Sequence, residues 1–316
     1  MELAWGFMES VKIDEWRLRA VGRIREVLDS VLRLLQDYEI PATWALLGHL
    51  FLDKCERKER PHSEIPRPSY AWFEGDWFKY DPCTDIERDP LWYGKDIVEK
   101  ILDFSSDSVA EQEIACHSFS HPVFGDPGCS KEFARAEIDK CLAIMKGYET
   151  RPRTFVFPLG SVGHVRLLKE RGFTAFFSGI SQLVKGSSLG RLAPSAFHRY
   201  VSSGIELLSN NSLLSPPVSV PEMVLPGLWA IPGSMCFNKK RNVPLKFVVL
   251  RAKRGIERAI REKACFYMYT HLHNFGVDSG SLLHSFENIL RYVDEKRQVG
   301  ELQVTNVQEL VRSLEH

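Results

Sequence analysis

The spacing of apolar residues along this chain changes between a helical period and short continuous runs. Apolar positions recur every three or four residues over 16–38, with a polar opposite face, which predicts an amphipathic helix. Similar spacing predicts helices over 132–147, 162–171, 282–292 and 307–314, the first with Ser130 as its N-cap and Gly147 as its end. Short apolar runs predict strands over 40–47, 155–157, 173–177 and 266–270. This alternation is typical of a parallel barrel or a doubly wound sheet.

Two long segments follow neither pattern. Residues 55–95 are rich in Pro, Trp, Tyr and Asp, and residues 179–232 are punctuated by Gly, Ser and Pro. The first segment is too long and irregular for a simple connection between elements. We therefore expect a single domain over 1–316 that carries an irregular, aromatic-rich insertion at about 55–95.

One short segment carries two closely spaced histidines. Residues 113–122 read Glu-Ile-Ala-Cys-His-Ser-Phe-Ser-His-Pro and place His117 and His121 after an apolar run. If the chain turns helically after Cys116, residues four apart lie on one face, and both imidazoles can bind one divalent metal ion. Otherwise the two are polar loop residues, and an isolated His-x-x-x-His motif does not decide between these alternatives. Cys116 is not expected as a ligand, because on a strand its side chain points to the opposite face.

Three further segments give this motif its context. They are Met-Glu-Leu-Ala-Trp-Gly at 1–6, Phe-Val-Phe-Pro-Leu-Gly-Ser-Val-Gly-His at 155–164, and Phe-Tyr-Met-Tyr-Thr-His-Leu-His-Asn at 266–274. In this order and with these separations, the four segments resemble the successive motifs of the polysaccharide deacetylase family, also described as NodB-homology or carbohydrate esterase family 4 proteins. The resemblance runs from Glu2 to about Asn274, and its most specific part is the His-Ser-x-x-His-Pro segment.

The resemblance implies an α/β fold with a distorted (β/α) barrel and a divalent metal ion, expected to be Zn²⁺, at the carboxyl ends of the strands. Glu2 matches the carboxylate ligand of that family, and His117 and His121 match its pair of histidine ligands. His271, at the end of the strand predicted over 266–270, matches the general acid that protonates the departing amine. His273 is the alternative acid, because two residues further on it shares a face of an extended chain.

Other positions are expected to contact the substrate. They are Trp5, Pro158 and Trp229, although Trp229 suits the hydrophobic core equally well. The aromatic rings of the insertion at 55–95 can offer flat faces to sugars, or they can form a cluster that fixes a surface loop.

The sequence departs from the family pattern in two places. The catalytic base of the family is an Asp two residues before the metal-binding acid, and a hydrophobic first strand precedes it; the chain begins at Met1 and contains neither. We expect that Met1 is an internal methionine of a longer product; the alternative is a protein that has lost its first strand and its base. The family also places an Arg after the Phe-Pro dipeptide, where this chain has Leu159, so only Arg153 or His164 is near in sequence.

Composition limits the classes of function. The chain has 316 residues, of which 44% are hydrophobic and 26% charged, and the 41 basic residues balance the 41 acidic ones. No basic field exists to hold nucleic acid, and no segment is long and apolar enough to span a membrane. Seven cysteines without a Cys-x-x-Cys motif, and the absence of a signal peptide from the sequence as given, favour a cytoplasmic protein.

These observations lead to three hypotheses about function. The first is a metal-dependent hydrolase that removes N-acetyl groups from amino sugars of a polysaccharide or its precursor. The second is an amidohydrolase that acts on a small cyclic amide. The third is a catalytically impaired, deacetylase-like protein that binds glycans. The aromatic insertion favours a sugar over a cyclic amide, whereas the missing base favours the third hypothesis.

Overall fold

The computed structural model describes residues 1–8, 14–56, 59–179, 215–239 and 243–315. Its main sheet has six strands in the order β1-β2-β3-β4-β6-β5. All neighbouring pairs are parallel except β5 with β6, which are antiparallel. The strands are β1 (Ala42–Leu46), β2 (Gln112–Cys116), β3 (Thr154–Val156), β4 (Ala175–Phe177), β5 (Glu222–Leu225) and β6 (Leu228–Ile231).

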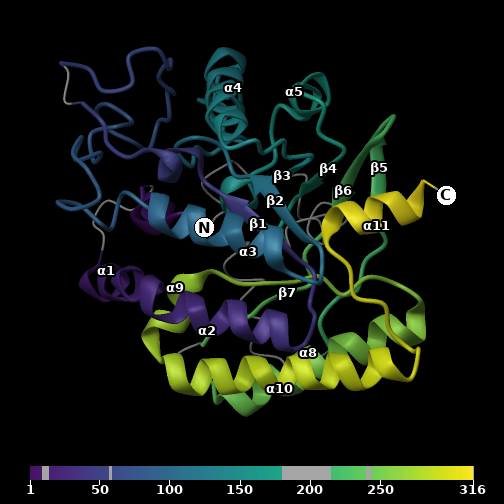
Figure 1. The fold of residues 1–316 in the computed structure, drawn as a ribbon. Helices are drawn as coiled ribbons and strands as arrows, with labels where there is room; N and C mark the ends of the chain where they lie inside the picture. The colour runs from purple at the N-terminus through teal and green to yellow at the C-terminus, as the bar shows by residue number, and fades with distance from the viewer. Residues whose placement is uncertain (9–13, 57–58, 180–214, 240–242, 316) are drawn as a thin grey trace.

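Helices cover both sides of this sheet. In Figure 1, α4 and α5 lie on one side, and α2, α8 and α10 lie on the other. The α-helices are α1 (Glu15–Gly22), α2 (Ile24–Asp37), α3 (Lys95–Asp107), α4 (Lys131–Gly147), α5 (Val165–Glu170), α8 (Leu245–Glu262), α9 (Leu272–Val277), α10 (Ser279–Gln298) and α11 (Val307–Leu314). Three short 3₁₀ helices are η1 (Leu3–Phe7), η2 (Gly48–Phe51) and η3 (Pro158–Gly160).

Two further strands form a second, two-stranded sheet. Its parallel strands are β7 (Met235–Cys236) and β8 (Met268–Tyr269). The predicted α/β class with parallel strands is therefore confirmed. Within the described ranges the strands form one open sheet and this separate pair, so closure into a barrel is not seen there. No helix in the described part of the chain is long and apolar enough to cross a membrane.

The helical spacing of apolar residues predicts some of the helices and misses others, and one predicted helix needs correction. The six apolar residues of α2 at that spacing are all buried. The prediction of a single helix over 16–38 is wrong. The backbone leaves the helical conformation at Arg23, with φ −90° and ψ 1°, and this break separates α1 from α2. The Arg23 guanidinium donates a hydrogen bond of 3.2 Å to the carbonyl of Gly276, which ties this break to α9.

The ends of two helices follow from their capping residues. Ser130 accepts a hydrogen bond from the backbone N–H of Phe133, which confirms it as the N-cap of α4. Asn306 and Glu309 form a reciprocal capping box at α11, and this helix has the predicted bounds. The helix predicted over 282–292 is shorter than α10, and the spacing of apolar residues did not predict α3, α8 or α9.

Backbone contacts bring the first residues of the chain to the sheet. The Met1 carbonyl accepts a hydrogen bond of 3.1 Å from the N–H of Leu47, and the Met1 amino group donates to the carbonyl of Ala45. Residue 1 therefore lies against the carboxyl end of β1, and Glu2 follows directly. Because parallel strands place their carboxyl ends at one edge of a sheet, Glu2 lies at the same edge as the segment that follows β2.

The sequence predicts an irregular insertion at about 55–95, and the described residues between η2 and α3 are 52–56 and 59–94. This stretch contains turns and an isolated bridge between Lys54 and Asp85, and regular structure resumes at α3. Four of its eight Phe, Trp and Tyr side chains are buried: Tyr70, Trp77, Phe78 and Tyr93. The other four, Trp72, Phe73, Tyr80 and Trp92, are partly exposed. The insertion is therefore held in part by its own aromatic cluster.

The prediction of a second irregular segment over 179–232 is wrong in part. Residues 180–214 lie outside the described residues. The remainder forms the β5–β6 hairpin, and β6 pairs with β4 inside the main sheet.

Candidate metal centre

Glu2, His117 and His121 converge at the carboxyl edge of the sheet. The Glu2 Oε2 atom lies 2.6 Å from Nε2 of His121 and 3.2 Å from Nε2 of His117. All three residues are buried, and their ligand atoms lie within 4.8 Å of one another. The structure thus brings together residues that are more than one hundred positions apart in the sequence, as the resemblance implied.

The two histidines do not meet through a helical turn, so that premise of the sequence argument is wrong. His117 follows β2, and the residues after it form a tight loop in which Ser118 and His121 adopt left-handed conformations, with φ 64° and 65°. Such conformations are costly for residues other than glycine and persist where their surroundings enforce them. The loop brings the two imidazole centroids to 5.0 Å.

Glu137 of α4 anchors this loop through hydrogen bonds. Its Oε2 atom accepts hydrogen bonds from the backbone N–H groups of Phe119 (3.1 Å) and Ser120 (2.8 Å), and its Oε1 atom accepts one from the Ser120 hydroxyl. Complete burial raises the pKa of Glu137 to about 7, although these hydrogen bonds oppose the rise. The sequence analysis missed this residue; an acid at a core-facing position of an amphipathic helix was the available signal.

The hydrogen bond of His117 fixes which ring nitrogen faces Glu2. Nδ1 lies 2.7 Å from the carbonyl oxygen of Val156, and because a carbonyl can only accept, Nδ1 carries the proton. Nε2 is then the atom available for a metal ion. Burial lowers the pKa of His117 to about 4, so the imidazole is neutral at pH 7. A neutral imidazole with this orientation is the form that ligates metals.

Glu2 is ionised in spite of its burial. Burial alone would raise its pKa, but the neighbouring His121 and His271 and the contacts of the carboxylate with the His117 and His121 rings lower it well below its ordinary value. Gly6 makes room for the side chain, because a Cβ atom at that position would lie only 2.6 Å from Cδ of Glu2. One carboxylate and two imidazoles are a donor set that fits Zn²⁺ and related divalent ions.

His271 is the fourth side chain at this centre. It follows β8, caps the start of α9, and places Nε2 at 3.2 Å from Oε1 of Glu2. Its side chain is 41% exposed, so it faces solvent on the open side of the cluster. His273 stacks behind it, with ring centroids 5.1 Å apart, and burial lowers the pKa of His273 to about 4. Because residue 273 lies in α9, the extended geometry assumed from the sequence is wrong.

The three expected substrate contacts lie in different environments. Trp5 is completely buried, donates its indole N–H to the carbonyl of Trp92 at 3.1 Å, and supports the site from behind. Pro158 is buried at the start of η3. Trp229 packs beside Ala175 and Ile231, against Val307 and Val311 of α11. For all three residues, substrate contact stays a prediction.

The two side chains considered as replacements for the family's Arg do not reach this centre. Arg153 is exposed and precedes β3, at the amino edge of the parallel sheet, whereas the cluster lies at the carboxyl edge. His164 directs Nε2 to the carbonyl oxygen of Cys129, 2.8 Å away. Cys116 is excluded as a ligand, as expected, since its thiol contacts Cys141 at 3.4 Å on the other face of β2. All seven cysteines are free thiols.

Known proteins that resemble this chain indicate which family it belongs to. The chain is similar to a solved GH57-type branching enzyme from the hyperthermophilic archaeon Pyrococcus horikoshii, with 12% sequence identity and a TM-score of 0.40. That match covers 70% of this chain and 48% of the enzyme, so the chain spans about half of the enzyme's length. No curated protein sequence matches the chain.

The family model for polysaccharide deacetylase matches residues 19–176. This range is half of the chain and includes the loop that carries His117 and His121, while Glu2 and His271 lie outside it. The chain therefore belongs to the polysaccharide deacetylase family.

Proposed function

We propose that this protein is a metal-dependent hydrolase that removes N-acetyl groups from amino sugars of a polysaccharide or its precursor. The observation that carries the proposal is the convergence of Glu2, His117 and His121, with 2.6 and 3.2 Å between the carboxylate and the two Nε2 atoms. Family membership supports an amide hydrolase. The strand order is compatible with the distorted barrel of that family, which we retain as part of the proposal.

Glu2, His117 and His121 would hold the divalent ion, with Zn²⁺ the expected species. When bound, such an ion supplies Lewis acidity toward the acyl oxygen and lowers the pKa of a water molecule. The buried carboxylate keeps its charge through the contacts described above, and the Val156 carbonyl holds His117 in the productive tautomer. These residues therefore fix position and charge before any substrate arrives.

His271 would complete the reaction. Hydrolysis forms a bond between the water oxygen and the acetyl carbon and breaks the bond from that carbon to nitrogen, whose electron pair stays on the nitrogen. Protonated His271 gives its proton to this nitrogen, which leaves as the amine of the sugar. The water gives up its two protons to the solvent, from which His271 is protonated again, and acetate is the second product. The exposure of His271 beside the buried cluster supports this role, because the acid must reach the substrate.

One observation favours a second candidate function. Glu2 is the only carboxylate of this cluster among the described residues, so within the cluster described there no second carboxylate can accept a proton from water. A deacetylase-like protein that binds glycans with little or no turnover fits this arrangement.

Acetate release and metal content test both candidates together. The full chain is assayed on a panel of N-acetylated glucosamine oligomers beside a variant that combines His117→Ala and His121→Ala. Deacetylation by the parent chain that is lost with the metal in the variant supports the hydrolase. Bound metal and glycan binding without acetate support the second candidate. The matched control is His284→Ala, an exposed histidine of α10, which should leave metal and activity unchanged.

A further inference from the structure

A second group of side chains with metal-binding chemistry lies in the described structure, apart from the candidate metal centre. It consists of His49, Cys55, His62 and Asp81, and one ligand atom from each lies within 4.8 Å of the others. His49 belongs to η2, directly after β1, and the other three residues belong to the insertion. We call these four residues the insertion cluster.

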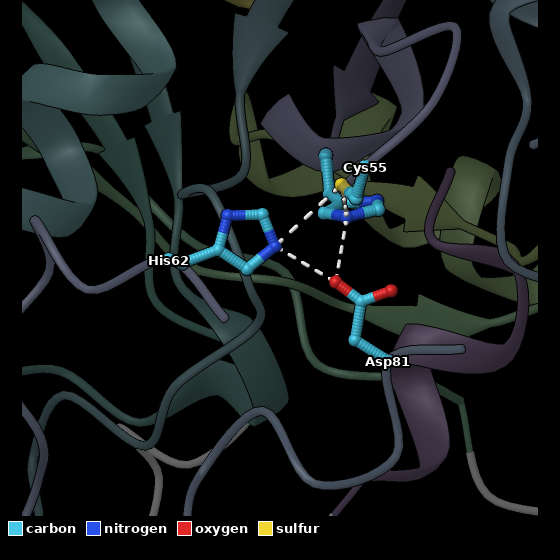
Figure 2. Close-up of side chains that lie close together, drawn as sticks. Cys55, His62 and Asp81 are labelled. Atoms are coloured by element: carbon cyan, nitrogen blue, oxygen red, sulfur yellow. Dashed lines mark hydrogen bonds and ion pairs between the residues drawn. The ribbon is translucent and has the colours of Figure 1, made fainter. Parts of the chain in front are cut away.

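The four ligand atoms surround one point. Asp81 Oδ2 lies 3.2 Å from Nε2 of His49 and 2.7 Å from Nε2 of His62. Cys55 Sγ lies 3.2 Å from Nε2 of His49 and 3.6 Å from that of His62. Figure 2 shows the thiol, the His62 ring and the carboxylate directed toward one another. With metal–ligand bonds of about 2.0–2.3 Å, two ligand atoms of a tetrahedral zinc site lie about 3.3–3.6 Å apart. Three of the four distances nearly match this value. The fourth, between Asp81 Oδ2 and His62 Nε2, is 2.7 Å and must lengthen when the ion binds.

Hydrogen bonding satisfies this group only with the help of a neighbour outside it. If both histidines donate from Nε2 to the Asp81 oxygen, the thiol hydrogen of Cys55 finds no acceptor on either ring and must turn to the Tyr93 hydroxyl, with which Cys55 has a side-chain hydrogen bond. If one ring instead presents a bare Nε2 to the thiol, that ring loses its bond to the carboxylate. A cation at the common point satisfies all four atoms at once.

Neighbouring groups orient the ligands of the insertion cluster. The second oxygen of Asp81, Oδ1, accepts from the N–H of Cys83 at 2.9 Å and from the Tyr93 hydroxyl at 3.3 Å, which leaves Oδ2 for the histidines. The backbone N–H of Cys55 donates to the carbonyl of Thr84, so the thiol is fixed beside Asp81. Hydrogen bonds that orient ligating carboxylates in this way are typical of metal sites.

The number of protein ligands distinguishes a structural site from a catalytic one. The side chains of His49 and Asp81 are completely buried, and that of His62 is 9% exposed. Structural zinc sites use four protein ligands, whereas catalytic sites leave one position open to water or substrate. Cys55 and His62 are only partly buried, so the case for a structural site rests on the number of protein ligands, which is four.

We propose that His49, Cys55, His62 and Asp81 bind a structural Zn²⁺ ion that fixes the insertion to the core of the protein. The mixed sulfur, nitrogen and oxygen donors suit zinc. This inference does not depend on the proposed deacetylase activity, because it concerns a different set of side chains.

The insertion cluster also contacts the walls of the candidate metal centre. The ring of Phe119, which lies between His117 and His121 in the sequence, packs 5.4 Å from His49 and 5.1 Å from His62. The ring of Trp5, three residues after Glu2, lies 4.2 Å from His49. The structural ion would therefore stabilise both segments that supply ligands to the first centre.

Metal stoichiometry and cobalt spectroscopy test this proposal on the full chain. The parent protein should bind two Zn²⁺ ions, and the variant that combines His117→Ala and His121→Ala should keep one. After replacement by Co²⁺, both proteins should show the near-ultraviolet charge-transfer band of a cobalt–thiolate bond, since only the insertion cluster contains a thiolate. Cys55→Ser should lose that band and one equivalent of metal.

Cys83→Ser is the matched control, because it alters a buried thiol of the same insertion that is not part of the cluster. It should keep both the metal and the band. The proposal is overturned if the parent protein binds cobalt without a thiolate band, or if Cys55→Ser keeps both the band and two equivalents. If Cys55→Ser does not fold, the spectra of the parent protein and of Cys83→Ser still decide.

Discussion

Replacement of Glu137 by leucine tests the account of how the histidine loop is held. The carboxylate of Glu137 is completely buried and accepts bonds from two backbone N–H groups and one hydroxyl of the loop. Leucine has nearly the same volume but no acceptor. The substitution Glu137→Leu therefore leaves three buried donors of the loop without partners while it changes the packing of α4 little.

The expected cost follows from these three donors. An unsatisfied buried donor costs about 1–3 kcal/mol. Because burial raises the pKa of Glu137 to about 7, its carboxyl is a weaker acceptor at pH 7 than one with an ordinary pKa, and we take the lower end of that range for each donor. The free energy of unfolding should fall by about 3 kcal/mol. Zinc affinity at the first centre should fall about 10- to 100-fold, as for other groups that orient ligands.

Urea denaturation of the metal-free protein measures the first quantity, and zinc titration against a competing chelator measures the second. To keep the insertion cluster out of the titration, both proteins carry Cys55→Ser. The control is Arg135→Gln, which changes an exposed side chain of the same helix and should alter neither value. An unchanged unfolding free energy together with unchanged zinc affinity in Glu137→Leu would refute the role assigned to this residue.

Three further changes probe the remaining parts of the centre. Gly6→Ala should displace the Glu2 carboxylate, since the new Cβ would lie 2.6 Å from Cδ, and zinc titration should show weaker binding at the first centre; unchanged affinity would contradict the geometry. His271→Ala should keep the metal and lower kcat by about 10²–10⁴-fold on an N-acetylated oligomer, as for other general acids, whereas loss of the metal would make His271 a ligand. The pKa of His117 is about 4 in the folded protein and about 6.5 in the unfolded chain, so its contribution to stability is complete above pH 6.5 and is lost as the pH falls toward 4. The metal-free protein should therefore lose about 3 kcal/mol over that interval by urea denaturation, and His117→Asn should flatten the dependence.

The parts of the fold that could be predicted from the sequence are those whose pattern reflects burial on one face. α2 and α4 each present an apolar stripe to the core, and a capping residue marks where α4 and α11 begin. The break at Arg23 could not be predicted in this way, because its cause includes a contact with Gly276, distant in the sequence. The strand β6 was missed for a related reason: its pairing with β4 depends on tertiary contacts.

The residues of the candidate site could be predicted from the sequence, but the way in which the backbone brings them together could not. Glu2, His117, His121 and His271 were identified by their resemblance to a family, and the structure places the three histidines in contact with Glu2. The helical turn assumed for the two histidines was wrong, since the loop depends on Glu137 and on left-handed residues that have no sequence signature.

The insertion cluster was not anticipated from the sequence. His49, Cys55, His62 and Asp81 have irregular spacing, and a long insertion without helices or strands gives no period that would place their side chains together. The four side chains come together only in the folded protein, where aromatic residues of the insertion pack around them. A sequence pattern identifies metal ligands when the ligands follow one another at short, regular intervals, whereas tertiary contacts determine which distant residues meet.

The most direct test of the central claim is a parallel measurement of bound zinc and released acetate for the parent chain and for His121→Ala, on N-acetylated glucosamine oligomers. The account predicts that the parent chain releases acetate, and that His121→Ala loses both the activity and one equivalent of zinc. Acetate release that persists at the parent rate in His121→Ala, or in the metal-free protein, would contradict a reaction that depends on a metal ion held by Glu2, His117 and His121.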